Sequence, residues 1–130
     1  MRDEATNWLA ESDATMKAAG HMMAAKQFNF AVWMARQSVE KALKAAHVAV
    51  RGESPPRTHG LRRLAEHVFG QVPEDVRRAL RELDPHYTVT QYPTATVERP
   101  SEYSLAEDAS EAIEAANLAQ LQRRPRIARR

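Results

Sequence analysis

The chain has 130 residues, 43% of them hydrophobic and 28% charged, which is the composition of one compact domain. It contains no cysteine, and this excludes disulfides, thiolate metal sites and cysteine nucleophiles. No apolar run approaches the ~18 residues that span a bilayer, and charged residues 2–4 replace the start of a secretory signal, so we expect a soluble, cytoplasmic protein without membrane contact.

The formal net charge of +2 depends on the carboxyl-terminal tail. Five of the last eight residues are arginine, and removing them leaves 14 of the 19 basic residues against 17 acidic ones. The sequence therefore predicts a mildly acidic domain over residues 1–122 and a basic, flexible tail over 123–130. Two interpretations of the tail are open, a solvated end or an arm that binds phosphates.

The patterning predicts helices throughout and no strand, since 23 alanines accompany apolar residues at helical spacing. Residues 3–19 place apolar side chains on one helical face, and Gly20 is expected to end that helix. Residues 27–51 carry an unbroken apolar stripe that ends at Gly52. This second helix should be about 36 Å long, close to the diameter of the whole domain, and is expected to form its spine.

Three shorter helices follow. The third is predicted over residues 61–69, between a cap at Thr58 or His59 and a stop at Gly70. The fourth begins at Pro73 and ends before Pro85, and the fifth runs from a capping box at residues 104–107 to about residue 122. We expect an all-α, up-and-down bundle of about five helices, in which the third and fourth cross one end.

Residues 84–103 show no helical periodicity, and they are predicted to form a long ordered loop before the last helix. All three tyrosines, Tyr87, Tyr92 and Tyr103, lie in this segment together with His86. The tyrosines either anchor the loop to the core or line a ligand site.

Several segments occur in a characteristic order: Trp8 in the first helix, Gln37-Ser38-Val39-Glu40-Lys41-Ala42-Leu43-Lys44-Ala45 in the second, Thr58-His59-Gly60-Leu61, and Leu83-Asp84 leading to Tyr87 and Tyr92-Pro93. This order resembles the HEPN family, the higher eukaryotes and prokaryotes nucleotide-binding domain. The resemblance implies a symmetric homodimer, a minimal nucleotidyltransferase protein as partner and, in many branches, metal-independent cleavage of RNA. Gln91 departs from the family, which tends to place an arginine before Tyr-Pro.

Ribonucleases of that family are recognised by an arginine and a histidine separated by four to six residues. Arg62 with His67 and Arg81 with His86 both match, and about two matches are expected by chance. Five residues turn a helix through about 500°, so Arg62 and His67 do not share a face. Pro85 frees Arg81 and His86 from helical phase, which favours them as the catalytic pair, with the imidazole moving a proton and the guanidinium holding phosphate. The alternative is that Arg81 and His86 have no catalytic role and are an ordinary arginine at a helix end and an ordinary histidine in a loop.

Three further pairs are candidates for ligand binding: Arg57 with His59, Lys41 with Lys44, and Tyr87 with Tyr92. His59 can instead cap the third helix, and the two lysines can instead form a solvated face. No metal ligands and no cofactor are predicted. The function expected is that of a small nucleotide- or RNA-interacting domain that works with a nucleotidyltransferase partner, with a toxin-like ribonuclease as one form of it. The alternative is a non-enzymatic interaction or oligomerisation module.

Overall fold

A computed structural model describes residues 2–57, 60–83 and 109–117. These residues form four helices, α1 (Arg2–Ala24), α2 (Phe28–Arg51), α3 (Leu61–Phe69) and α4 (Glu74–Leu83), and a further helical segment over 109–117. The described ranges contain no strand, and the predicted all-α helical bundle is confirmed. The predicted loop at 84–103, the capping box at 104–107 and the tail at 123–130 lie outside the described residues.

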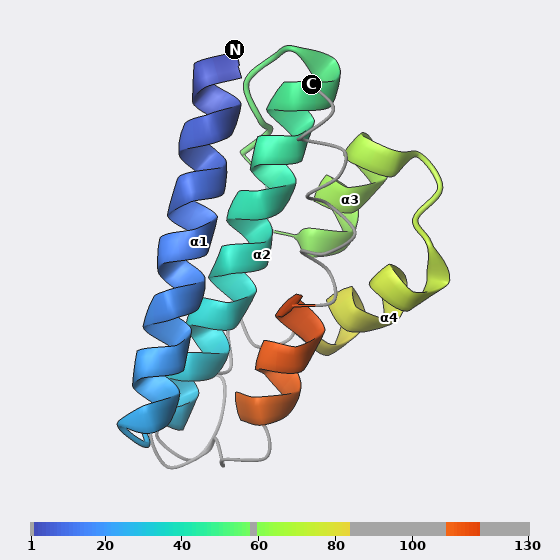
Figure 1. The fold of residues 1–130 in the computed structure, drawn as a ribbon. Helices are drawn as coiled ribbons and strands as arrows, with labels where there is room; N and C mark the ends of the chain where they lie inside the picture. The colour runs from blue at the N-terminus through green and yellow to red at the C-terminus, as the bar shows by residue number, and fades with distance from the viewer. Residues whose placement is uncertain (1, 58–59, 84–108, 118–130) are drawn as a thin grey trace.

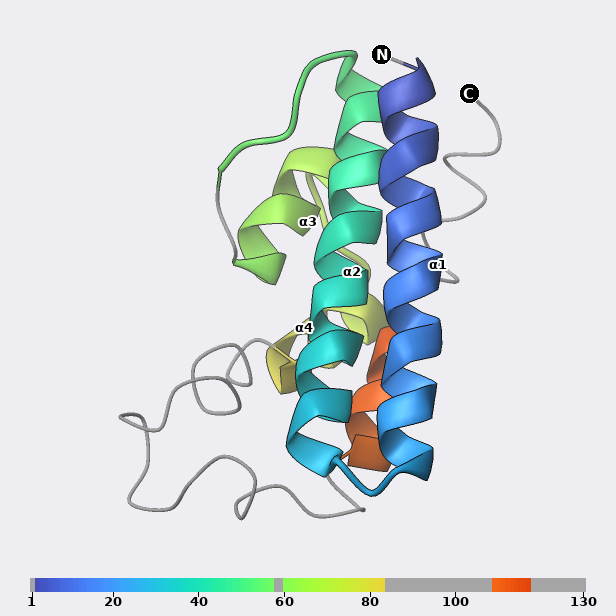
Figure 2. The same ribbon diagram turned by 90° about the vertical axis from the view of Figure 1, so that its left-hand side faces the viewer.

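Helices α1 and α2 run antiparallel and lie side by side along their whole length (Figures 1 and 2). The buried residues of α1 all have small side chains, and they are Ala5, Ser12, Thr15 and Ala19. Small side chains let two helix axes approach closely. The hydroxyl of Ser12 accordingly donates a hydrogen bond directly to the backbone oxygen of Ser38 in α2, at 2.6 Å.

The prediction that the first helix ends at Gly20 is wrong, because α1 continues to Ala24. A glycine inside a helix costs about 0.5–1 kcal/mol relative to alanine. Met22 and Met23 pack against the core beyond it, and this burial outweighs that cost. The chain reverses after Ala24 instead, where Lys26 takes a left-handed conformation with φ of 61°.

Helix α2 is the centre of the fold, as its apolar stripe predicts. Its fully buried aliphatic residues include Val32, Val39 and Leu43. The helix ends where expected, at Gly52, which adopts a left-handed φ of 68° and donates its N–H to the oxygen of Val48. None of the helices in the described ranges combines the length and the apolarity that crossing a bilayer requires.

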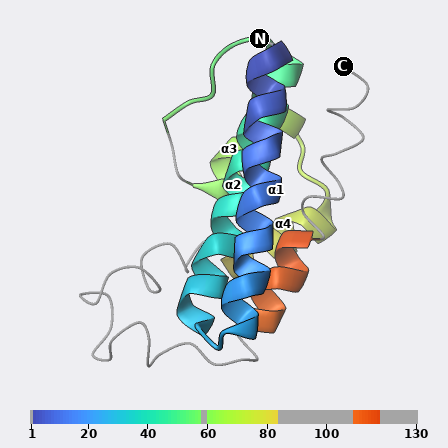
Figure 3. The ribbon, with the colours of Figure 1, turned by 60° about the vertical axis from the view of Figure 1, so that its left-hand side comes forward.

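Helices α3 and α4 lie at the side of the α1–α2 pair and not at its end, so the expectation that they cross one end of the bundle is wrong (Figure 1). After Gly52 the chain runs back alongside α2, which places α3 beside α2 and α4 beyond α3 (Figures 1 and 2). The bounds predicted for α3 are confirmed. The segment at 109–117 lies beside the half of the α1–α2 pair that contains the turn (Figure 3) and buries Ala109, Ala112 and Ala116.

Candidate functional site

A hollow of about 620 Å³ lies between α3 and α4, and we call it the arginine pocket. Its lining comes from α3, from the connecting residues 70–72 and from α4, and consists of Arg62, Glu66, Gly70, Gln71, Val72, Arg77, Leu80 and Arg81. A volume of this size falls in the range that holds small-molecule ligands. Of the eight lining residues that the structure describes, three are arginines and one is a glutamate, so this part of the lining carries net positive charge.

Helical spacing explains how the three arginines come to face one hollow. In α3, leucines at 61 and 64 are buried, and the opposite face carries Arg62 and Glu66 one turn apart. In α4, Val76 and Leu83 are buried, while Arg77 and Arg81 are one turn apart on the pocket side.

The connection between the two helices forms one wall of the arginine pocket. Gly70 ends α3 with φ of 72°, a conformation that an L side chain rarely adopts. The chain then runs through Gln71 and Val72 to Pro73, whose carbonyl oxygen accepts the first hydrogen bond of α4, from Arg77 N. A guanidinium nitrogen of Arg77 lies 3.5 Å from the carbonyl oxygen of Val72. This contact holds the Arg77 side chain against the connecting residues that form the wall.

The arginines of the pocket are paired only loosely. Arg62 Nε lies 3.0 Å from Glu66 Oε1, and the Arg62 side chain is 76% exposed. Glu74 is shared, since one of its oxygens lies 3.6 Å from Arg77 and the other lies 3.5 Å from Arg81. Ion pairs this exposed contribute about 0–1 kcal/mol, so water or an anionic ligand can replace either carboxylate at low cost.

This arrangement suits an anion that carries several oxygens. A guanidinium is a planar fork of N–H donors that matches phosphate and carboxylate oxygens in bidentate geometry. Val72 and Leu80 add apolar surface, and the amide of Gln71 adds both a donor and an acceptor. The pocket therefore offers charge for a phosphate and a mixed surface for an attached group.

The structure brings together the arginines of the two competing catalytic pairs, because Arg62 and Arg81 line the same pocket. It does not bring His67 there. That residue lies at the end of α3 nearest α2, where its carbonyl oxygen accepts a hydrogen bond from Arg51 and its ring meets the ring of His47 edge to face, with 5.9 Å between centroids. Arg62 and His67 are accordingly separated, as the helical phase predicts.

The other predicted ligand-binding residues are scattered or not described. His59, His86, Tyr87 and Tyr92 lie outside the described residues, and Arg57 is exposed before α3. Sequence reasoning missed Arg77, the third arginine of the pocket. Its spacing of four residues from Arg81 was the available signal.

Lys41 and Lys44 belong to the α1–α2 interface. Lys44 Nζ lies 3.1 Å from Glu40 Oε2 and sits over the ring of Trp8, 5.4 Å from its centroid. Lys41 Nζ bonds the hydroxyl of Thr15 at 2.8 Å. The alternative of a solvated face does not hold for Lys44, whose side chain is only 11% exposed.

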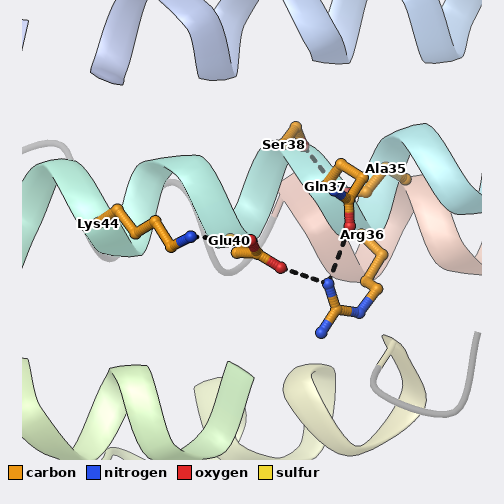
Figure 4. Close-up of polar contacts among 6 residues, drawn as sticks. All are labelled: Ala35, Arg36, Gln37, Ser38, Glu40 and Lys44. Atoms are coloured by element: carbon orange, nitrogen blue, oxygen red, sulfur yellow. Dashed lines mark hydrogen bonds and ion pairs between the residues drawn. The ribbon is translucent and has the colours of Figure 1, made fainter. Parts of the chain in front are cut away.

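Glu40 bridges Lys44 to a second buried cation, Arg36, which the sequence analysis did not single out. Figure 4 shows the three side chains in a row along α2, and Arg36 Nη1 bonds Glu40 Oε1 at 2.6 Å and Gln37 Oε1 at 2.9 Å. Arg36 is 1% exposed. We call Arg36, Glu40 and Lys44 the buried ion row, and it is a structural element of the α2 core.

His47 continues the polar side of α2 beyond this row. Burial lowers the pKa of the His47 imidazole below its ordinary value of 6.5, while Glu53, 3.5 Å from Nε2, acts in the opposite direction. Across residues 2–57, 60–83 and 109–117, no three His, Asp or Glu side chains are placed to hold a metal ion.

The comparisons agree with this fold. Residues 5–119 match the HEPN domain family, and the chain belongs to that family. TT1696 from Thermus thermophilus has a crystal structure to which this chain is 26% identical, with a TM-score of 0.88 over 95% of this chain and 98% of that one. ST0689, described as an archaeal HEPN homologue, has the same fold, with a TM-score of 0.79, 23% identity and the same coverage of both chains. No curated protein matches the chain significantly. Membership of the family supports a nucleotide- or RNA-related function.

Proposed function

We propose that this HEPN domain binds a nucleotide or RNA through the arginine pocket, and that it acts as a homodimer with a nucleotidyltransferase partner. The observation that carries the proposal is the presence of Arg62, Arg77 and Arg81 around one hollow. Family membership supports the nucleotide- or RNA-related class. The resemblance of the sequence to HEPN proteins supports the two partners.

The pocket is a better candidate for this role than the cations of α2. Arg36 and Lys44 are buried and already share Glu40, so a ligand would have to break the core to reach them. The pocket arginines are exposed, and their carboxylate partners can move into water. Of these two groups of described cations, the pocket is the one that a ligand can reach without a structural cost.

Binding of a short single-stranded RNA to the full chain tests the proposal. Arg77→Gln together with Arg81→Gln is expected to weaken binding at least about tenfold and to reduce its salt dependence, because two phosphate contacts are lost. Arg63→Gln with Arg78→Gln is the matched control, since these arginines lie on the same two helices and do not line the pocket. Equal effects of the two double variants would contradict the pocket assignment.

We include metal-independent RNA cleavage in the proposal, with Arg81 and His86 as the favoured pair. The position of Arg81 in the pocket suits a guanidinium that holds phosphate as charge develops. His86→Ala and Arg81→Ala should each lower the cleavage rate by about 10²- to 10⁴-fold, and EDTA should leave it unchanged. If Arg62→Ala and His67→Ala have these effects instead, the competing pair is the correct one. Loss of activity in EDTA would exclude the metal-independent reaction.

Two measurements test the partners. Light scattering at micromolar concentration should give about twice the monomer mass of 14.7 kDa. A nucleotidyltransferase protein encoded beside this chain should copurify with it when the two are coexpressed. A stable dimer or complex that binds neither nucleotides nor RNA would favour the alternative, a non-enzymatic interaction module.

A further inference from the structure

We infer that the arginine pocket is selective for a terminal phosphate, the phosphomonoester of a mononucleotide or of an RNA end, over the internal phosphodiesters of an RNA chain. This inference rests on the proposed function, because it assumes that the pocket is the phosphate site. It adds the chemical class of the group that enters the pocket.

The first argument is charge. Counting Glu74, which pairs with two of the arginines, three guanidiniums face two carboxylates at the pocket. Glu74 is 61% exposed and held by long contacts, so a ligand can displace it into water. Three cations and one carboxylate then remain, a charge of +2. A terminal phosphate carries about −1.5 to −2 at pH 7, whereas a phosphodiester carries a single charge.

The second argument is the number of donors and acceptors. A terminal phosphate has three peripheral oxygens, and a phosphodiester has two. The pocket supplies guanidinium forks from three positions, one on α3 and two on α4. Each fork can bond one or two oxygens of the same group. Only a phosphomonoester offers each of the three arginines a non-bridging oxygen of its own.

The third argument is shape. The connecting residues Gly70, Gln71 and Val72 close one side of the pocket, because they join its two helical walls. A continuous RNA strand would have to run past this wall to leave the pocket on that side, whereas a chain end would not. The sugar or base of a bound chain end or mononucleotide would contact the lining beside the phosphate.

Glu74 has a defined part in this arrangement. Its carboxylate contacts Arg77 and Arg81 at the same time, one oxygen to each, as two oxygens of a bound phosphate would. It therefore competes with the ligand for two of the three arginines. Removing its charge should strengthen binding, which is the opposite of what removal of a ligand contact does.

The experiment compares two RNAs of identical sequence, one with a 5′-phosphate and one with a 5′-hydroxyl, on the full chain. Both carry the same phosphodiesters, so contacts of the arginine tail to internal phosphates cancel, and the variants below separate the pocket from any contact of the tail to the terminal phosphate. We expect the phosphorylated RNA to bind at least about tenfold more tightly, since it alone offers the third oxygen and second charge. Arg81→Gln should abolish this preference, Glu74→Gln should increase it severalfold, and Arg78→Gln should leave it unchanged.

Acidity provides a second readout. The second pKa of a terminal phosphate is about 6, so the preference should shrink as the pH is lowered through that value. Among the described residues, the charged groups that face the ligand are Arg62, Glu66, Arg77 and Arg81, with Glu74 beside them. The 5′-hydroxyl RNA, measured over the same pH range, reports any change that arises in these groups.

The outcomes separate this inference from the proposed function. Equal binding of the two RNAs, lost together in the Arg77→Gln, Arg81→Gln variant, would overturn terminal-phosphate selectivity and leave the pocket as the phosphate site. Absence of binding to either RNA and to nucleoside monophosphates would overturn both. Competition by a nucleoside monophosphate at concentrations near its dissociation constant would identify the free nucleotide as a source, and selective binding of the phosphorylated RNA alone would identify the RNA end.

Discussion

Two arginines of this chain each pair with a glutamate four residues later, and their environments are opposite. Arg36 and Glu40 meet at 2.6 Å inside the core, where their side chains are 1% and 6% exposed. Arg62 and Glu66 meet at 3.0 Å on the surface, where theirs are 76% and 49% exposed. Breaking the buried pair is costly in free energy, because each charge would be left desolvated without its partner. In the surface pair, water or an anion can take the place of the carboxylate at low cost. Location, and not residue type or spacing, separates an arginine that supports the fold from one that a ligand can use.

Neutralising Glu40 should have the largest effect on stability. Glu40→Gln keeps the shape of the side chain but places two buried cations beside an uncharged amide, so we expect a loss of about 3–5 kcal/mol in the free energy of unfolding. Glu66→Gln is the matched surface variant and should cost about 0–1 kcal/mol. Urea unfolding measures both, and similar losses would contradict the difference drawn between the two pairs.

Leu43→Ala should be the next most damaging change. Leu43 is fully buried in the middle of α2, and truncation should cost roughly 2–5 kcal/mol through lost burial and a cavity. Leu80 is also buried but lines the arginine pocket, so the space left by Leu80→Ala opens onto a hollow that water can enter. Urea unfolding should place Leu80→Ala at the lower end of the same range. A loss at Leu43 of less than about 0.5 kcal/mol would mean that the buried face of α2 is incorrectly assigned.

His47 should make stability depend on pH in a defined direction. Its pKa is lowered in the folded state, chiefly by burial, so below its ordinary value of 6.5 the unfolded chain binds more protons than the folded one. The stabilisation is therefore complete above pH 6.5 and is lost as the pH falls from there to the lowered pKa. Urea midpoints measured between neutral and mildly acidic pH should fall in the parent and fall less in His47→Gln. His67→Gln removes a neighbour that also lowers the pKa of His47, so it should reduce the slope less than His47→Gln does, and a flat parental profile would contradict the prediction.

The smallest stability effects are expected in the arginine pocket. Arg62→Gln and Arg81→Gln each remove an exposed ion pair, so each should change the free energy of unfolding by no more than about 0.5–1 kcal/mol. Their effect should appear in ligand binding instead. A thermal melt of each variant checks the first statement, and a large drop in melting temperature would show that these side chains support the fold.

The sequence predicted the helices best where burial and end signals agreed. In α2 the apolar stripe and Gly52 pointed to the same bounds, and in α3 the stripe and Gly70 did so. At Gly20 the glycine predicts the end of the first helix, and that prediction is wrong. The helix continues because Met22 and Met23 find a core to pack against, which is a tertiary effect that glycine propensity does not contain.

The candidate site could be predicted only in parts. Arg62 and Arg81 were singled out as members of rival pairs, since the angle between α3 and α4 that unites them is not encoded in either helix. Lys44 was a candidate for ligand binding or for a solvated face, since a lysine is rarely buried without a partner. The structure supplies that partner in Glu40, which also pairs with Arg36. The spacing of residues along a helix indicates which side chains share a face. Which other residues that face contacts depends on how the helices pack.

The four buried residues of α1, Ala5, Ser12, Thr15 and Ala19, have a consequence for how this protein can change over time. Two helices close enough for a serine hydroxyl to reach the opposite backbone leave no room for an added methylene. Drift toward larger side chains is therefore resisted at these positions. The alanine content of the first helix therefore specifies a distance between two helices, and in distant relatives that distance should persist after most other side chains have been replaced.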